Sequence, residues 1–158
     1  MKKKILAGVL AGASIATSLN AAAQSSMGVG YGYAGGDGVS FSSVALDFAG
    51  RFNDNFGMAI TTHVGGSDQG ADLDYLAAAK LRGGIPVGNA SFMYLTAGFG
   101  RVQLSGPGGS ASENGGLVGA GFETFSEDGK WGFGFEYTTG TSDFDGLDAG
   151  NFTIRYKL

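Results

Sequence analysis

An eight-stranded antiparallel β-barrel that crosses a membrane up and down is the fold that this sequence predicts. Three observations support it. Apolar residues recur at every second position in eight segments, which is the period of a β-strand. The positions between them hold mostly small residues, with few charges. Short turns alternate with longer loops along the chain, as in an up-and-down meander.

The first 23 residues have the pattern of a secretory signal. Lysines at 2–4 are followed by an apolar run over 5–16 and by three alanines at 21–23, a small-residue cleavage pattern. An apolar run of about a dozen residues is too short for the roughly 20 that a membrane-spanning helix needs. We therefore predict a cleaved signal peptide over 1–23 rather than a retained anchor, and one barrel domain over 24–158.

The composition of the mature chain excludes several classes of protein. Without the three signal lysines, 7 Lys and Arg face 14 Asp and Glu, a net charge of −7. No basic patch is available for phosphates, so we expect no nucleic-acid partner. The chain has no Cys and therefore no disulfide framework. Charged residues make up 15% of the sequence against roughly 25% in ordinary soluble domains, and 31 residues are Gly.

Each predicted strand carries one apolar row. In chain order these rows are Met27-Val29-Tyr31-Tyr33, Val44-Leu46-Phe48-Phe52, Phe56-Met58-Ile60-Val64, Leu73-Tyr75-Ala77-Ala79-Leu81, Met93-Leu95-Ala97-Phe99, Val118-Ala120-Phe122, Trp131-Phe133-Phe135-Tyr137 and Phe152-Ile154-Tyr156-Leu158. The last two rows are the clearest, because a nearly continuous aromatic face is backed by Gly, hydroxyl and charged residues. The segments span about 27–34, 39–52, 56–64, 73–82, 90–104, 116–125, 131–138 and 151–158.

Three places break the alternation. Val39 and Phe41 have the opposite parity to the rest of their segment, which predicts either a β-bulge near 42–43 or a strand start that rises clear of the paired region. Leu76 interrupts the fourth row. Val102 and Leu104 are out of phase with the fifth. A bulge over 98–100 would restore that phase and turn residues 101 and 103 to the same side as 94 and 96.

The connections fall into two classes. Short turns are expected at 53–55, 84–89 and 126–130, and Pro86 lies in the second of them, where a missing ladder hydrogen bond costs nothing. Longer loops are expected at 35–38, 65–71, 105–114 and 140–148. Turns at one end and loops at the other are typical of membrane barrels.

The small-residue row decides which face meets lipid. As the water-facing surface of a soluble barrel, a row of Gly, Ala, Ser and Thr would be an odd choice, because Gly weakens strands. Inside a narrow eight-stranded membrane barrel, the same row leaves room for charged side chains. Eight charged residues lie on this row: Asp47, Arg51, Lys80, Arg82, Glu123, Glu136, Arg155 and Lys157.

These charges are expected to pair inside the barrel. A lipid-facing Lys or Arg costs roughly 2–4 kcal/mol at the membrane midplane, so we predict an interior ionic cluster in which Glu123 and Glu136 meet Arg155 and Lys80. The alternative is a set of solvated surface charges. Aromatic residues mark both ends of the predicted strands, with Phe52, Phe56, Trp131 and Tyr156 near the turns and Tyr31, Tyr33, Tyr75 and Tyr137 near the loops. Interfacial belts have such a two-ended distribution.

With these features, residues 24–158 resemble the small eight-stranded outer-membrane barrels of Gram-negative bacteria, the group containing OmpX, Ail and the OmpA barrel domain. The final segment is similar to that family's C-terminal insertion signal through Phe152, Ile154, Tyr156 and Leu158. Leu158 stands where the family usually has Phe. The resemblance implies recognition by the barrel assembly machinery through the C-terminal strand.

An enzyme of this size would resemble the lipid A palmitoyltransferases and deacylases that use a His with a Ser and a carboxylate. His63 is the only histidine, and Val64-Gly65 after it does not form the deacylase His-x-Ser element. We interpret His63 as a residue of the lumen or loop rim, although a triad could still assemble in space. No catalytic residue is assigned.

No cofactor or metal site is assigned either. Residues 30–35 match a dinucleotide fingerprint by letters, but no helix follows. The loops and their edges carry only acidic charges, namely Asp37, Asp68, Asp72, Glu113, Asp143, Asp145 and Asp148. They would repel anionic lipopolysaccharide or glycans unless divalent ions bridge them. Residues 143–146 partly resemble a calcium loop without its full spacing.

The sequence thus predicts an exported, porin-like outer-membrane barrel with a structural or cell-surface interaction role and no catalysis. The expected partners are outer-membrane lipid, lipopolysaccharide and the assembly machinery, and the expected state is a monomer. The alternatives are a lipid A-modifying enzyme and a narrow small-solute channel.

Overall fold

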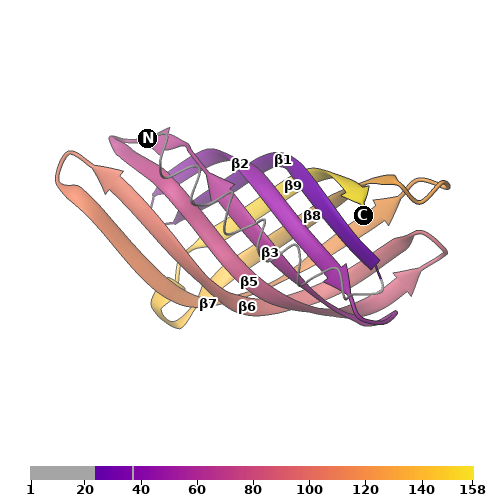
Figure 1. The fold of residues 1–158 in the computed structure, drawn as a ribbon. Coiled ribbons are helices and arrows are strands. Elements are labelled where there is room, and N and C mark those ends of the chain that lie inside the picture. Colours follow the sequence, from indigo (N-terminus) through magenta and orange to yellow (C-terminus); the bar gives the residue numbers. More distant parts are fainter. Residues whose placement is uncertain (1–23, 37) are drawn as a thin grey trace.

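The computed structural model describes residues 24–36 and 38–158, which form a closed β-barrel (Figure 1). The expected signal peptide and Asp37 lie outside the described residues. The strands are β1 (Gln24–Gly36), β2 (Val39–Arg51), β3 (Phe56–Val64), β4 (Ser67–Asp68), β5 (Ala71–Val87), β6 (Ser91–Gly106), β7 (Gly109–Phe125), β8 (Trp131–Thr141) and β9 (Asp148–Lys157), with a 3-10 turn η1 (Ser142–Phe144) before β9.

The barrel closes because every long strand has two antiparallel neighbours. β1 pairs with both β2 and β9, and β3 pairs with β5, so that the ladder runs right round the molecule. β4 is a two-residue strand that pairs only with the start of β5. Closure removes the open sheet edges from the barrel wall and leaves unpaired edges only where strand ends project, as in β5 after Gly83 and β7 before Gly116. The predicted eight-stranded antiparallel barrel is confirmed.

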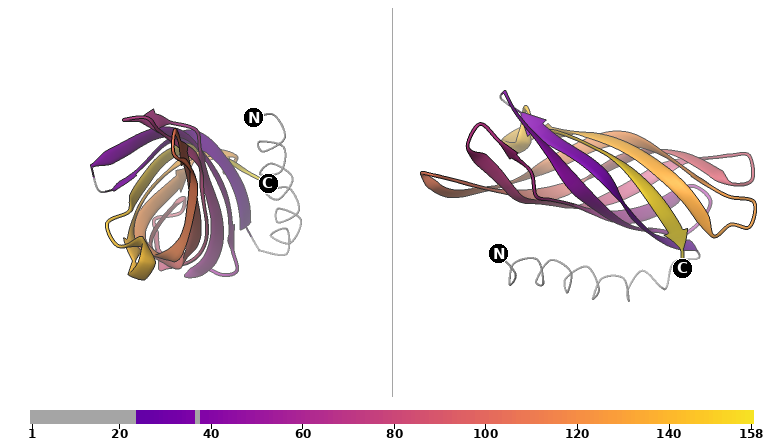
Figure 2. Two further views of the ribbon diagram at one scale, coloured as in Figure 1. Left: turned by 90° about the vertical axis from the view of Figure 1, so that its left-hand side faces the viewer. Right: turned by 90° about the horizontal axis from the view of Figure 1, so that it is seen from above.

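The two ends of the barrel differ, as the connection lengths predict (Figure 2). The C-terminus lies at the end with the short turns. One of these turns is fixed by Asn53, whose side-chain oxygen accepts hydrogen bonds from the backbone of Asn55 at 2.9 Å and of Phe56 at 2.8 Å. The other end, the loop end, carries η1 and the tip of the β6–β7 hairpin.

The prediction of a loop at 105–114 is wrong, because most of this segment is strand. β6 and β7 continue as a paired ladder to Gly106 and Gly109, and the hairpin projects beyond the other strands at the loop end (Figure 1). Beyond the barrel rim both faces of a hairpin meet water, so the apolar alternation stops although the strand pairing continues. The other predicted loops are also shorter, since β4 lies within 65–71 and η1 within 140–148.

The turn predicted at 84–89 is shorter as well, because β5 runs on to Val87. Pro86 therefore lies in a strand, where it pairs with Phe92 of β6. The β3–β5 ladder ends at Phe56 and Gly83. Pro86 thus has no strand on its other side, which is where a residue without an N–H is tolerated.

Neither predicted bulge exists. The β1–β2 register is continuous, with Phe41 opposite Ala34, and β6 is continuous with both neighbours over 98–100. The one register shift in β5–β6 lies between Leu73 and Tyr75. It turns both Leu73 and Leu76 into the barrel, where they are buried. The apolar residues that break the alternation are an interior group at the loop end.

The absence of a bulge at 98–100 changes the side on which Arg101 lies. Without a bulge at 98–100 it faces outward and is exposed, unlike Tyr94 and Thr96, which are buried. Its guanidinium donates a hydrogen bond to the Ser112 hydroxyl at 3.0 Å. The predicted side for this residue is wrong, because the interior at this height is apolar.

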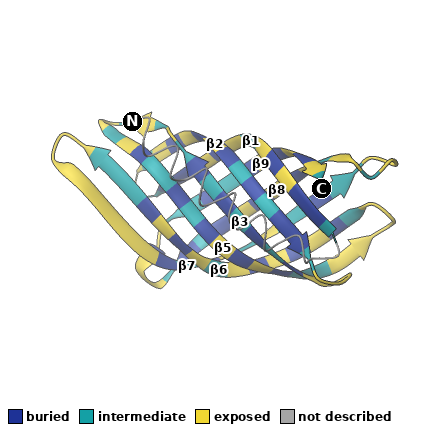
Figure 3. Cartoon of the chain, viewed as in Figure 1, coloured by how far each residue is buried: buried dark blue, intermediate teal, exposed yellow. Residues whose placement is uncertain are grey.

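Within the barrel wall, the two rows of the long strands differ in exposure (Figure 3), whereas residues 109–114 of β7 are all exposed. Residues of the apolar rows are exposed on the outer face, and Leu95 reaches 70%. The alternate residues are buried inside. No helix in the described part of the chain is long and apolar enough to span a membrane.

Candidate functional site: the barrel interior

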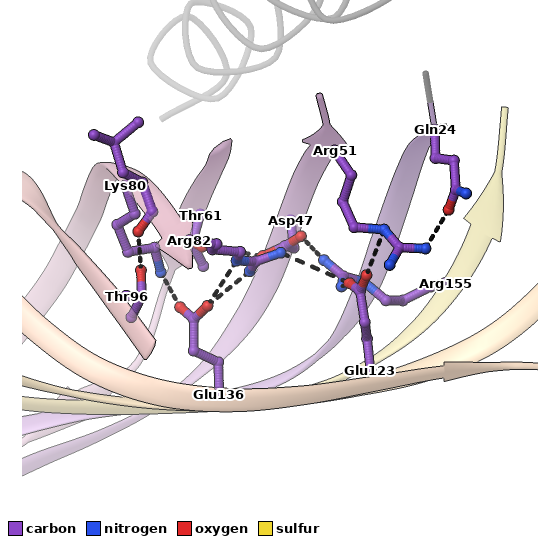
Figure 4. A network of polar contacts seen from close by, with 11 residues as sticks. Gln24, Asp47, Arg51, Thr61, Lys80, Arg82, Thr96, Glu123, Glu136 and Arg155 are labelled. Atoms are coloured by element: carbon purple, nitrogen blue, oxygen red, sulfur yellow. Dashed lines mark hydrogen bonds and ion pairs between the residues drawn. The ribbon is translucent and has the colours of Figure 1, made fainter. Parts of the chain in front are cut away.

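A network of buried ions fills the middle of the barrel (Figure 4). Arg82 of β5 is its hub. Its guanidinium donates to Glu136 of β8 at 2.7 Å and to Asp47 of β2 at 3.0 Å, and its charge is stacked over the ring of Tyr94 at 4.5 Å. Lys80, two residues earlier on the same face of β5, is paired with the other oxygen of Glu136. Four strands are thereby tied together across the lumen.

The network continues toward the turn end through Arg155 of β9. This side chain is 1% exposed and is paired with both Asp47 and Glu123. Arg51 lies 4.0 Å from Glu123, with its guanidinium 5.0 Å from the ring centre of Phe92. Three fully buried carboxylates, those of Asp47, Glu123 and Glu136, thus meet three fully buried cations, a composition that limits the cost of burying charge.

Of the eight charged residues on the predicted inward row, Lys157 is half-buried and lies over the ring of Phe125 at 5.9 Å. For the other seven the predicted interior cluster is confirmed, including the pairs Glu136 with Lys80 and Glu123 with Arg155. The alternative of solvated surface charges is wrong for these residues. Two bridging roles leave no trace in the sequence pattern. Asp47 joins two arginines from different strands, and Arg82 contacts all three carboxylates. Parity along a strand indicates which residues face inward, but contacts across the lumen depend on strand tilt and stagger.

Glycines make the room that the charged side chains occupy. A Cβ on Gly134 would lie 3.0 Å from Arg155 Cδ, and one on Gly98 would lie 2.7 Å from Lys80 Cγ. The ring of Tyr94 lies against Gly121 in the same way. The small-residue row is therefore the complement of the ionic network, as predicted.

His63 lies inside the barrel, on the loop-end side of this network, and is 3% exposed. The prediction that His63 lies on the inward row is correct. It lies within the lumen and not at the loop rim. Its Nδ1 is 3.2 Å from the Ser43 hydroxyl, and both side chains are buried. No carboxylate within 24–36 and 38–158 hydrogen-bonds to His63, so the pair lacks the third group that orients a catalytic histidine.

An apolar layer closes the interior at the loop end. Its buried members come from seven elements: Ala34, Phe41, Leu73, Leu76, Ala78, Val102, Leu117, Phe144 and Ala149. Phe144 of η1 folds over the mouth and is 2% exposed. Sequence reasoning missed this layer, although the parity breaks at Phe41, Leu76 and Val102 were its signal.

The acidic residues of the loop end are spread over several loops. Asp68 of β4 accepts a hydrogen bond from the backbone of Ser40 at 2.8 Å. Among the described residues, no three His, Cys, Asp or Glu side chains lie close enough together to hold a metal ion. The calcium hypothesis therefore has no ligand set in this part of the chain.

The outer face carries the aromatic residues at both ends. Phe52, Phe56, Trp131 and Tyr156 are exposed near the turns, and Tyr31, Tyr33 and Tyr137 are exposed near the loops. Tyr75, predicted with the second group, is only half-exposed. Trp131 and Tyr156 form an edge-to-face pair with ring centres 4.9 Å apart. The Tyr31 hydroxyl is 2.8 Å from that of Ser42. These side chains cover the ends of the outer face rather than filling a core.

Neither a protein-family model nor a curated protein matches the sequence. Solved structures do match the fold. The N-terminal β-barrel domain of Pseudomonas aeruginosa OprF aligns with a TM-score of 0.66 at 10% identity, covering 84% of this chain and 97% of that one. The outer membrane protein OprG of the same organism gives 0.60 at 12% identity, covering 87% and 96%.

Ail, the attachment invasion locus protein of Yersinia pestis, gives a TM-score of 0.54 at 17% identity and covers 85% of this chain and 97% of its own. Identities this low carry the fold alone. The closed antiparallel ladder, the outward apolar rows and these alignments lead to one conclusion: the chain has the fold of the small eight-stranded outer-membrane barrels.

Proposed function

We propose that this chain is an integral outer-membrane protein, exported with a cleaved signal over 1–23, that has a structural or cell-surface interaction role without catalysis. The observation that carries the proposal is the reversal of polarity across the barrel wall. Ions lie inside, and Val29, Leu95, Phe135 and Ile154 are among the many apolar side chains exposed outside.

Such an outer face is incompatible with water. Soluble monomers rarely expose contiguous apolar patches above a few hundred Å², yet here large apolar residues are exposed on every long strand of the barrel. A hydrocarbon environment removes the free-energy cost of exposing these apolar side chains to water. It also requires every backbone polar group in the span to be paired, which a closed barrel provides.

We propose outer-membrane lipid and lipopolysaccharide as the surroundings and a monomer as the state. The C-terminal strand supports recognition by the barrel assembly machinery. Phe152, Ile154, Tyr156 and Leu158 all face outward, and the backbone N–H of Leu158 donates to Ser25 at 2.9 Å, so the terminal residue completes the seam between β9 and β1.

The acidic loop end restricts the chemistry of a surface partner. Ail has been crystallised with sucrose octasulfate, a polyanionic heparin analogue. In this chain the loop end carries Asp68, Glu113, Asp143 and Asp145, and Arg101 is the one nearby cation among the described residues. Cationic partners fit this charge.

A filled interior weighs against the channel alternative. The ionic network and the apolar layer occupy the middle and the mouth of the lumen. In planar bilayers we therefore expect no single-channel current from the folded protein. For the enzyme alternative, lipid A extracted from overexpressing cells would change mass, and we expect no change.

Membrane location is tested by expressing the full chain in a Gram-negative host. We expect it in the outer-membrane fraction, with heat-modifiable gel migration and a mature N-terminus at Gln24. Recovery as a dissolved periplasmic protein, with Trp131 quenched no better by brominated lipid than by aqueous iodide, would overturn the proposal.

A further inference from the structure

A cavity of about 260 Å³ lies at the loop end of the barrel, between η1 and the strand ends. Its wall is formed by Phe41, Leu73, Val102, Leu104, Phe144 and Leu147. An apolar cavity of about 150 Å³ already binds benzene, and drug-sized ligands occupy roughly 300–1,000 Å³. The cavity therefore suits one compact group somewhat larger than benzene.

The cavity is a blind pocket rather than part of a channel. Leu76 and Leu117 of the apolar layer are buried beneath its wall, and the His63–Ser43 pair and the ionic network lie farther along the same lumen. A ligand can therefore enter and leave only at the loop end, where Ala111, Ser112 and Glu113 are exposed.

The charged residues that line this cavity all have one sign. Glu113 comes from the extended part of β7, and Asp143 and Asp145 come from η1 and the residue after it. Among residues 24–36 and 38–158, no Lys or Arg lines the cavity. Within the described residues, no ion pair or side-chain hydrogen bond occupies these three carboxylates. The lining is mostly apolar, and its charged side chains are all acidic. A matching ligand would be apolar at one end and cationic at the other.

We propose that this cavity binds a small amphiphilic cation, with its apolar body between Phe41 and Phe144 and its ammonium group at the mouth, where the exposed carboxylates of Glu113, Asp143 and Asp145 give a negative potential. Aromatic faces add a favourable contact for such a cation. The proposal concerns the folded barrel itself, so its failure would leave the proposed membrane location standing.

The test uses the full barrel in nanodiscs of zwitterionic lipid, titrated with phenyltrimethylammonium. Methyl NMR signals of Leu73, Leu104 and Leu147 report on the cavity. We expect saturable shifts at these methyls, weaker binding of the neutral isostere tert-butylbenzene and no binding of benzenesulfonate, because the carboxylates attract only the cation.

Charge dependence is tested with two triple variants of equal net charge. The variant E113Q/D143N/D145N should raise the Kd for phenyltrimethylammonium at least about tenfold. The control D54N/E127Q/D128N removes three charges from the turns at the opposite end of the barrel, none of which lines the cavity, and should leave the Kd within about twofold, since distant exposed charges are screened.

Occupancy is tested by filling the mouth. Ala111 lines the cavity and is exposed, whereas Ser110 beside it does not line the cavity. A111W should abolish the shifts, and S110W should retain them. Heat-modifiable migration of each variant shows that it is folded.

Three results would each overturn the proposal: no saturable shift at millimolar probe, equal affinity in E113Q/D143N/D145N and wild type, or equal binding of benzenesulfonate. Shifts that persist in A111W would show uptake into lipid rather than into the cavity, and would overturn it too.

Discussion

At the scale of single residues, the interior is held by a few ions whose partners come from distant parts of the sequence. Arg155 meets Asp47, which is 108 residues away. Such a network is sensitive to the loss of one member, because the partner left behind is a buried, unpaired charge. The sensitivity follows from burial rather than from the number of contacts.

Glu136→Ala tests this directly. It removes the shared partner of Lys80 and Arg82, and we expect the free energy of unfolding to fall by about 3–5 kcal/mol. Reversible urea unfolding in lipid vesicles measures it. Glu127→Ala is the control, since Glu127 is exposed in the β7–β8 turn and its removal should change stability little. An unchanged midpoint for the first variant would contradict the role given to the network.

Asp128 provides a pH test outside the membrane span. The Ser126 hydroxyl and the backbone N–H of Lys130 donate to its carboxylate, and these hydrogen bonds lower the pKa of Asp128 below its usual value. A lowered pKa stabilises the fold above the unfolded-state value, and this contribution is lost as pH falls through the folded-state value. NMR titration should show Asp128 titrating below an exposed aspartate, and Ser126→Ala should raise its pKa.

At the scale of strands, glycines lie opposite the buried charged side chains and leave space for them. Gly134→Val would place a branched side chain against Arg155, whose Cδ would lie only 3.0 Å from the new Cβ. Overpacking of this kind costs about 1–3 kcal/mol. Gly108→Val is the matched control, because a Cβ there meets nothing within 4 Å. Equal stability of both variants would show that the interior has spare volume.

The strands also show how far sequence reasoning reaches. Period-two alternation identified all eight barrel strands and the inward row of charges. It failed where its physical basis ends. In the β6–β7 extension both faces meet water, so no alternation marks the ladder. At Phe41 and Val102 the inward row becomes apolar and the outward row becomes polar, because the interior changes from ionic to apolar along the strand. The parity of the apolar residues therefore reverses although the strand itself is regular. Tilt and stagger, which choose the partners of Asp47 and Arg82, leave no local signal.

At the scale of the whole molecule, a charged substitution on the outer apolar face should change stability in opposite directions in a membrane barrel and in a soluble barrel. Leu95→Arg places a charge on the most exposed apolar position. In a bilayer it should destabilise the barrel by about 2–4 kcal/mol. In water, it would be neutral or favourable.

Gln103→Arg is the matched control for this change. Gln103 is on the same strand and the same outer row, next to Arg101 and toward the loop end, so a cation there should be tolerated. Vesicle unfolding of both variants measures the difference. Equal stabilities would argue against lipid on the outer face.

The projecting β6–β7 hairpin has a practical consequence. Its tip, Pro107-Gly108, stands clear of the other strands, and an exposed tip of small residues is where chains best accept insertions. A peptide epitope inserted between Pro107 and Gly108 should leave the barrel intact and be recognised by antibodies on unbroken cells. A tag in the 126–130 turn should be reached only after the envelope is permeabilised, so the pair would fix which way the molecule points.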